Sequence, residues 1–577
     1  MTKTGKISRA VKWRTTVTIW ATLAVCSGWS SLSATDVAKR GGRLIVSQRA
    51  EPKTLNPITA IDGSSREIIG LINADLIHIN RHSLKTEPGL ATSWRVSSDG
   101  RVYTLELRRG LKFSDGQPFD AADVLFTFEV YLDERVHASQ RDLLIIAGQP
   151  IKVQKLNQYS VRFELAQPYA AAERLFDSIA ILPRHLLKQA YDEGRLDKAW
   201  NLTVPPKEIA GLGPFRVKEY IAGQRMVLER NPFYWKMDVA GNRLPYLDAI
   251  DVEFTGNAEA EAMRFEQGEI DVAGRLSAAN FSVLEKHQRD GEFRLFDLGP
   301  GLEYNFLFFN LNDLGTALPS IAQRQNWFHQ LAFRQAVSEA IDRQAISRLV
   351  YQGRARPLST HVTPGNYLWV NRNIPPEVYS AARARASLRS AGFSWNRAGQ
   401  LIDSQRKPVI FSLIFNAGNP QHTQIATLIQ NDLQQVGMDV KVVPLEYRSM
   451  LDRIFKSYDY EAAILQLASG DADPNAEINV WTSGGGTHVW NLAPKHALAP
   501  WQEEVDRLMR QQMITPDYAQ RKHMYDRVQQ VVRENLPIIC LVSPDVLAGA
   551  SQKLGNFHPA ILSSYIVWNA EELYLRR

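Results

Sequence analysis

Cysteine and the short motifs of enzymes are scarce in this 577-residue chain. Only Cys26 and Cys540 are present, so no disulfide framework is available. The sequence contains no GxSxG turn, no HExxH motif, no GxxxxGK(S/T) loop and no GxGxxG after a predicted strand. The 12 histidines show no paired metal-ligand spacing on a helix. We therefore expect a protein that is not an enzyme and that holds no metal and no cofactor.

Long apolar runs are also few. The run Val17–Val25 is well short of the ~20 residues that a membrane-spanning helix needs. It follows a basic stretch at residues 3–14 and precedes several small residues, which is the arrangement of a secretory signal peptide. We expect residues 1–34 to be removed and the mature chain to be periplasmic. The four residues that end at Cys26 resemble a lipoprotein box, so a chain that is cut before this cysteine and carries a lipid on it is the alternative.

Charge and length narrow the class of protein further. The chain carries 67 basic and 61 acidic residues, but five of the basic ones lie in the expected signal peptide. The mature chain would therefore be nearly neutral, which does not favour nucleic acid as a partner. Its length exceeds the ~250–300 residues at which single cores stop growing, so more than one lobe is expected.

Local patterns predict a mixed fold. The runs Thr92–Ser97 and Val102–Arg108 alternate like strands around a turn signal, and Asp120 can cap a helix that follows them. Beyond residue 300, strands and helices alternate, which is typical of an α/β lobe. Apolar residues with a helical period predict one helix over Ala332–Val350. Gly437 is expected to end another helix.

Three segments carry a family resemblance. The run Gly89–Glu129 resembles the signature region of the family 5 extracellular solute-binding proteins, the dipeptide, oligopeptide and nickel receptors of bacterial ABC importers. The segment Gly211–Trp235, which begins GLGPF and ends RNPFYW, is also similar to this family. So is the helix that ends in AIDR at Arg343. The resemblance covers residues 42–577.

The resemblance implies an α/β, two-lobed periplasmic binding protein fold of type II, with a hinge between the lobes. Residues 35–296 and 537–577 would form lobe I, with an extra subdomain at 81–205. Residues 297–536 would form lobe II. The chain would cross between the lobes near residues 297–302 and 535–540.

The resemblance also implies a function. The protein would be the extracytoplasmic receptor of an ABC importer, a monomer that binds a short peptide between its lobes and delivers it to permease subunits in the membrane. Closure around the ligand would need no chemistry. The same scaffold could instead bind a metal chelate, an oligosaccharide or another solute. A ligand sensor and a secreted enzyme are the alternatives of other classes, and the missing motifs argue against the enzyme.

The segment Leu467–Asn475, LASGDADPN, is the best candidate for ligand binding. A matching segment in peptide receptors of the family supplies an aspartate that pairs with the α-amino group of the peptide. The resemblance assigns this role to Asp471, with Asp473 as its neighbour. The alternative is that both aspartates only build the loop before Pro474 by hydrogen bonding to their own backbone.

Four other residues are candidates for ligand contact. Trp481 and Trp490 flank a glycine-rich loop and could wall a pocket, or either could lie in a core. Tyr304 and Asn305 begin a strand whose segment reaches the cleft in the family, although most of such a strand must be core.

Overall fold

The computed structural model describes residues 39–177, 179–288, 292–314, 317–492, 499–562 and 566–576. The expected signal peptide and Cys26 lie outside these ranges. No helix within them is long and apolar enough to cross a membrane. All of the helices and strands described below lie in one compact unit of the chain, which is Ala38–Arg577.

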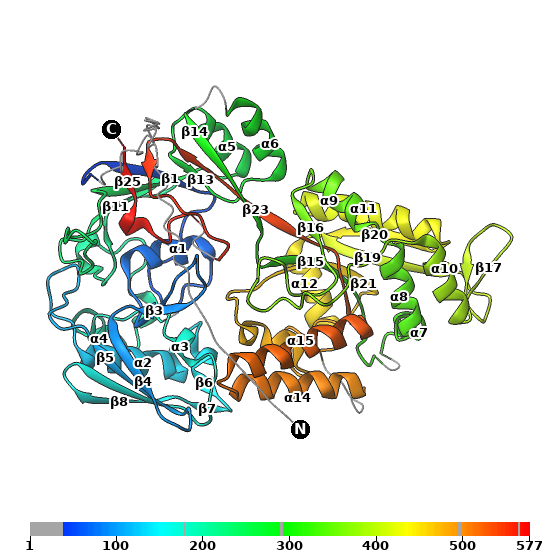
Figure 1. Ribbon diagram of the computed structural model, residues 1–577, viewed down its shortest axis with the longest axis horizontal. Helices are drawn as coiled ribbons and strands as arrows, with labels where there is room; N and C mark the ends of the chain where they lie inside the picture. Colours follow the sequence, from blue (N-terminus) through cyan, green and yellow to red (C-terminus); the bar gives the residue numbers. More distant parts are fainter. Residues whose placement is uncertain are drawn as a thin grey trace, which may run out of the picture. The chain divides into compact units, whose positions relative to one another are not determined.

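The first lobe is built on a mixed eight-stranded sheet (Figure 1). Seven of its strands follow one another in the order β10 (Phe215–Ile221), β11 (Arg225–Arg230), β12 (Ala249–Phe254), β1 (Arg43–Gln48), β13 (Val272–Ala273), β23 (Val542–Ser551) and β14 (Phe293–Pro300). The eighth strand, β16 (Ala355–Pro357), pairs with β23. Strand β1 pairs in parallel with β12 and β13, and the other pairs are antiparallel. Helices α5 (Ala258–Glu266) and α6 (Ala278–His287) contribute Phe265 and Phe281 to an apolar cluster beside β14.

The extra subdomain is a four-stranded antiparallel sheet covered by a helix. Its strands run in the order β4 (Ala91–Val96), β5 (Val102–Leu107), β9 (Ser160–Glu164) and β8 (Lys152–Asn157). The predicted hairpin is confirmed. The predicted cap is also confirmed, because Asp120 accepts from Ala122 N at 2.7 Å at the start of α2 (Ala121–Leu132), while Asp123 accepts from Asp120 N at 3.0 Å.

The GLGPF segment lies against the end of helix α1 (Gly63–Ile72). A Cβ at Gly211 would meet Ile72 O at 1.9 Å, so only glycine permits this approach. The Gly213 N–H donates to the same carbonyl at 3.0 Å. The motif thus packs its backbone directly on α1 and fixes where this helix lies.

The second lobe is a five-stranded sheet with a core on each face. Its strand order is β20 (Asp439–Leu445), β19 (Ile410–Asn416), β21 (Ala462–Ala468), β15 (Glu303–Phe309) and β22 (Ile538–Cys540). Successive side chains of a strand point to opposite faces. Accordingly, Leu307 and Phe309 of β15 join one cluster, and Phe306 and Phe308 join the other.

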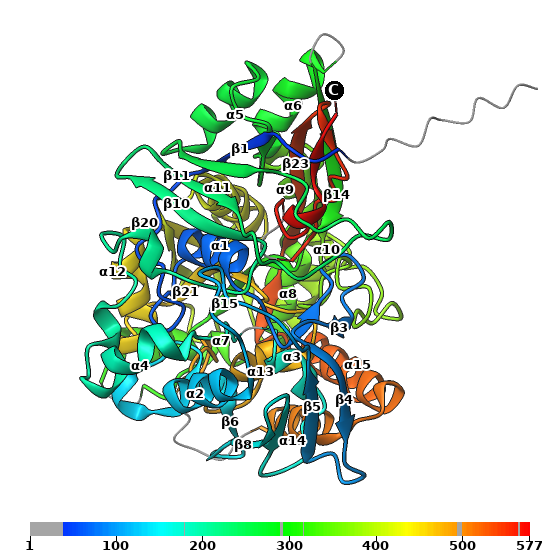
Figure 2. The same cartoon turned by 90° about the vertical axis from the view of Figure 1, so that its left-hand side faces the viewer.

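Helices cover both faces of this sheet (Figure 1), and Figure 2 shows β14 and β23, the strands that lead into and out of this lobe, side by side. Helices α8 (Leu331–Ala340) and α11 (Pro420–Gln435) pack on the face that contains Leu307, and α14 (Pro500–Ile514) and α15 (Tyr518–Asn535) pack on the face that contains Phe306.

The prediction of one helix over 332–350 is wrong. The chain breaks at Ile341, because Asp342 caps a second helix, α9 (Arg343–Val350), by accepting from Ala345 N at 2.9 Å. Gly437 follows α11 at φ +91°, as predicted.

Apart from the short strand β16, which pairs with β23, the chain changes sheets twice. It leaves the first sheet after Pro300 and enters the second at Glu303, and it returns between Cys540 and Val542. The first change falls at residues 301–302 and the second at residue 541, because β14 continues to Pro300 and β22 still pairs with β15. Two connections of one or two residues therefore join the sheets.

A carboxylic acid lies inside the core of the second lobe. Glu477 Oε2 accepts from Trp481 Nε1 at 2.9 Å and lies 3.5 Å from the Tyr304 hydroxyl. Burial raises the pKa of Glu477 to about 7, and these hydrogen bonds offset part of that rise. The folded protein therefore holds this proton up to a higher pH than the unfolded chain does.

This raised pKa predicts a pH-dependent stability. The stabilising contribution of the protonated acid is complete below about pH 4.5 and is lost as the pH rises through about 7. Between about pH 5 and about pH 8, the free energy of unfolding of the native protein should fall by roughly 1–3 kcal/mol relative to that of Glu477→Gln. Urea denaturation at several pH values measures this difference. Glu259→Gln, on the exposed side of α5, is the control and should show no such trend. Parallel pH profiles for the native protein and Glu477→Gln would contradict the prediction.

Candidate functional site

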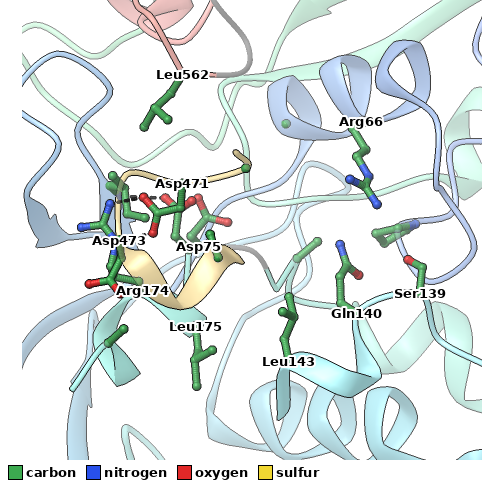
Figure 3. Close-up of a pocket in the computed structure, with 18 of the residues that line it drawn as sticks. Arg66, Asp75, Ser139, Gln140, Leu143, Arg174, Leu175, Asp471, Asp473 and Leu562 are labelled. Carbon is green, nitrogen blue, oxygen red and sulfur yellow. Dashed lines mark hydrogen bonds and ion pairs between the residues drawn. The ribbon is translucent and has the colours of Figure 1, made fainter. Parts of the chain in front are cut away.

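A cavity of about 540 Å³ lies among residues 57–81, 139–143 and 169–180 of the first lobe and residues 470–476 of the second (Figure 3). The last segment is the loop that follows β21. Helix α1 and the short helix α3 (Ala172–Leu175) contribute side chains from the first lobe. The size is that of pockets that bind small ligands, and both lobes contribute to the wall.

Asp471 lies in the wall of this cavity and forms an ion pair with Arg174 of α3. The guanidinium Nε and Nη2 each contact one carboxylate oxygen of Asp471, and Arg174 Nη1 donates to Leu84 O at 3.0 Å. Ala472 N donates to Asp471 Oδ1 at 2.6 Å. The side chains of Arg174 and Asp471 are 16% and 21% exposed. The carboxylate is therefore accessible, but a guanidinium of the protein already neutralises it.

A second group of charges lies beside this pair. Asp177 accepts from Arg81 Nη2 at 2.9 Å and from Ile79 N at 2.6 Å. His78 Nδ1 is 3.4 Å from a carboxylate oxygen of both Asp75 and Asp177. Burial and the negative charge of Asp177 raise the pKa of Asp75 above its usual range. Two acids and one guanidinium, Asp75, Asp177 and Arg81, thus line this end of the cavity, and the imidazole of His78 lies behind them.

Three of these residues could hold a cation by their chemistry. Asp75, His78 and Asp177 each offer one ligand atom, and these atoms lie within 4.8 Å of one another. Carboxylates and imidazole suit several divalent metals. However, Arg81 brings a fixed positive charge to one of the three, so we interpret the group as an ion-pair network.

The contacts of Asp473 hold the loop after β21 in place. It is buried and forms a bidentate ion pair with Arg521 of α15, with distances of 2.8 and 2.9 Å. Its Oδ1 also accepts from Asn475 N at 3.0 Å, which caps the short helix η6 (Pro474–Glu477). Gln512 completes the hydrogen bonds of the guanidinium. The Asn475 contact is that of the loop-building alternative, and Asp473 also lines the cavity.

The other four candidate residues lie in the core of the second lobe. Trp481 and Trp490 are 1% and 2% exposed, and their ring centroids are 5.6 Å apart. Tyr304 is equally buried next to Glu477, and Asn305 is fully buried with its Oδ1 3.1 Å from His422 Nε2. None of the four lines the cavity as the described residues form it. Their positions match the core role that was the alternative for each.

Most of the charged residues that line the cavity were not predicted from the sequence. Arg174 is 297 positions from Asp471, and Arg66, Asp75, Arg81 and Asp177 belong to no short motif that marks a site. The one signal in this region is indirect. GLGPF requires a close backbone neighbour, and that neighbour is α1, which carries Arg66.

The two aspartates of the loop should differ in their effect on stability. Asp473→Asn leaves the buried guanidinium of Arg521 without its counter-charge and should lower the free energy of unfolding by about 3–5 kcal/mol. Asp471→Asn breaks a partly exposed pair and should cost about 1 kcal/mol. Chemical denaturation of both variants measures the difference, and each serves as the control for the other. Equal losses would show that Asp473 does not anchor the loop.

Comparisons with known proteins agree with this architecture. The family described as bacterial extracellular solute-binding proteins, family 5 Middle, matches residues 85–488. A probable ABC transporter-binding protein of Deinococcus radiodurans is 25% identical over 541 residues, which are 90% of each chain. The oligopeptide-binding protein AppA of Bacillus subtilis is 24% identical over 551 residues, 93% of this chain and 94% of AppA.

Solved structures show the same fold. AppA of Bacillus subtilis in complex with a nonapeptide matches with a TM-score of 0.70 at 24% identity, over 94% of this chain and 100% of that one. NikA of Brucella suis in complex with Fe(III)-EDTA matches with a TM-score of 0.77 at 23% identity, over 93% and 100%. Because the family match spans more than half of the sequence, this chain belongs to the family 5 bacterial extracellular solute-binding proteins.

Proposed function

We propose that this protein is the extracytoplasmic receptor of an ABC importer and that it binds a short peptide in the cavity between residues 57–180 and 470–476. The observation that carries the proposal is Asp471, a carboxylate in the cavity wall on the loop that matches the ammonium-binding segment of peptide receptors. The relatives described above support it, since AppA is an oligopeptide-binding protein.

The carboxylate of Asp471 has room for a ligand ammonium. A carboxylate offers about four acceptor positions. Arg174 uses two of them and the Ala472 N–H uses a third, which leaves one on Oδ2. A peptide ammonium can therefore bind beside Arg174 without displacing it. Such a charge-assisted hydrogen bond is stronger in a cavity that excludes water than at an open surface.

Binding between the lobes would also explain transport. A ligand that contacts both walls stabilises the arrangement in which the walls meet, and this arrangement would be the one that the permease recognises. The protein would act as a monomer outside the cytoplasmic membrane, after removal of residues 1–34. A lipid on Cys26, if it is the first mature residue, would tether it to the membrane surface instead.

Native mass spectrometry of the protein purified from a bacterial periplasm tests the proposal. We expect a chain that lacks its signal peptide and carries adducts with the masses of short peptides. A chelate or sugar mass would keep the receptor function and overturn the peptide assignment. A catalytic turnover product of added peptides would overturn the receptor function itself.

The ammonium site predicts the behaviour of Asp471→Asn. This variant should bind trialanine about tenfold more weakly than the native protein does, because one charge-assisted hydrogen bond is lost. N-acetyl trialanine should bind both proteins equally. Isothermal titration calorimetry measures the affinities, and Asp192→Asn on the exposed end of α4 (Arg184–Asp192) is the control. Equal losses for both peptides would remove the ammonium-binding role.

A further inference from the structure

One stretch of the second lobe has almost no acidic side chains. Residues 378–431 contain a single acid, Asp403, although the chain as a whole carries 67 basic and 61 acidic residues. Six bases against this one acid give the stretch a net charge of +5. We refer to the six bases as the basic patch, and they are Arg383, Arg385, Arg389, Arg397, Arg406 and Lys407.

The members of the basic patch lie close together in the fold. The guanidinium carbons of Arg385 and Arg389 are 5.0 and 5.2 Å from the ring centroid of Trp395. Arg397 lies two residues beyond this tryptophan, and the turn at residues 403–407 directly follows the strand that pairs with it. Helix and hairpin thus form one basic surface. The elements that carry it are α10 (Ala381–Ser390), β17 (Ser394–Trp395) and β18 (Leu401–Ile402).

Most of these cations have no acidic partner. Arg383 forms an ion pair with Glu339 at 2.7 Å, and its side chain is still 59% exposed. Asp403 does not neutralise the others, because its carboxylate accepts from Trp327 Nε1 at 3.1 Å and from backbone N–H groups of its own turn. Four members are exposed and form no ion pair with any residue that the structure describes, namely Arg389, Arg397, Arg406 and Lys407.

Apolar and aromatic side chains lie beside the basic patch. Val378 and Tyr379 come just before α10 and are 54% and 40% exposed. The Tyr379 hydroxyl donates to Gln435 Oε1 at 3.3 Å, and Arg385 Nη2 donates to Gln435 O at 2.6 Å, so the tyrosine lies next to the patch. Exposed rings and aliphatic side chains next to cations are typical of surfaces that meet the headgroup region of a membrane.

We infer that the basic patch binds the surface of a membrane that contains anionic phospholipids. Five of its six cations are arginines, and a guanidinium offers two parallel N–H groups that fit a phosphate. Several cations near an anionic lipid surface attract it together, and salt screens this attraction. A fluid lipid surface adapts to side chains that protrude from a helix and a hairpin, whereas an acidic protein partner needs a matching shape.

The inference goes beyond the proposed function, because it does not depend on which solute is bound. None of the six residues lines the cavity among the described residues. Helix α10 and strand β17 lie at the end of the second lobe that is opposite the first sheet (Figure 1). A receptor held at the membrane surface in this way would be concentrated beside the permease subunits that it is proposed to serve.

Co-sedimentation with lipid vesicles tests the inference. The mature chain is produced without residues 1–34, so that no lipid on Cys26 contributes. The probes are vesicles of phosphatidylcholine alone and vesicles that also contain about one third phosphatidylglycerol. At about 0.05 M salt the native protein should bind the anionic vesicles at least about tenfold more tightly than the neutral ones, and about 0.5 M salt should abolish the difference. The variant Arg389→Gln/Arg397→Gln/Arg406→Gln/Lys407→Gln should lose most of this preference.

A matched control removes the same number of charges from the first lobe. The control is the variant Lys152→Gln/Lys198→Gln/Lys207→Gln/Lys286→Gln, which replaces four exposed lysines. It should bind the anionic vesicles as the native protein does. Since all eight side chains are exposed, both variants should unfold at the native temperature, which circular dichroism measures.

Three results would overturn the inference. Equal losses in the two variants would show that net charge, and not the basic patch, attracts the protein to the vesicles. A native protein that binds neither kind of vesicle would remove the membrane as the partner. Loss of binding to a lipid-free, detergent-solubilised permease in the patch variant, with no vesicle binding by the native protein, would identify an acidic protein surface instead. Binding of trialanine by both variants would show that the proposed function stands whichever result is found.

Discussion

The buried ion pair between Asp473 and Arg521 holds the loop after β21 against helix α15. Two charges inside a protein are stable only when their hydrogen bonds are nearly complete. Here Asp473 also caps η6, and Gln512 saturates the guanidinium. The loop can therefore adopt few other conformations. Because Asp471 is only two residues earlier, this constraint also sets where its carboxylate lies in the cavity.

Most of the charged side chains in the cavity wall form ion pairs. Most of its acids lie close to a cation, as Asp471 does to Arg174 and Asp177 does to Arg81. Because the charges are paired, several of them can lie close together with little electrostatic repulsion, and the wall remains polar.

The two short connections between the sheets define what motion the architecture allows. A chain that crosses after Pro300 and again after Cys540 joins the lobes by neighbouring strands, since β14 pairs with β23 and β15 pairs with β22. Paired connections of this kind favour rotation about one axis. A ligand would influence that rotation by contacting both walls. The Arg174–Asp471 ion pair joins the same two walls.

Local sequence determined a good part of this protein. The hairpin of β4 and β5, the cap at Asp120, the end of α11 at Gly437 and the family itself follow from patterns within a few tens of residues, because turns, caps and periodicity depend on neighbours in the chain. The break at Ile341 shows the limit, since a capping aspartate overrode the apolar period. Only the tertiary structure decided that Trp481 and Trp490 lie in a core and that Arg81, Arg174 and Asp471 line one cavity. Burial and ion pairing are set by residues hundreds of positions apart, and no local pattern encodes which of them will meet.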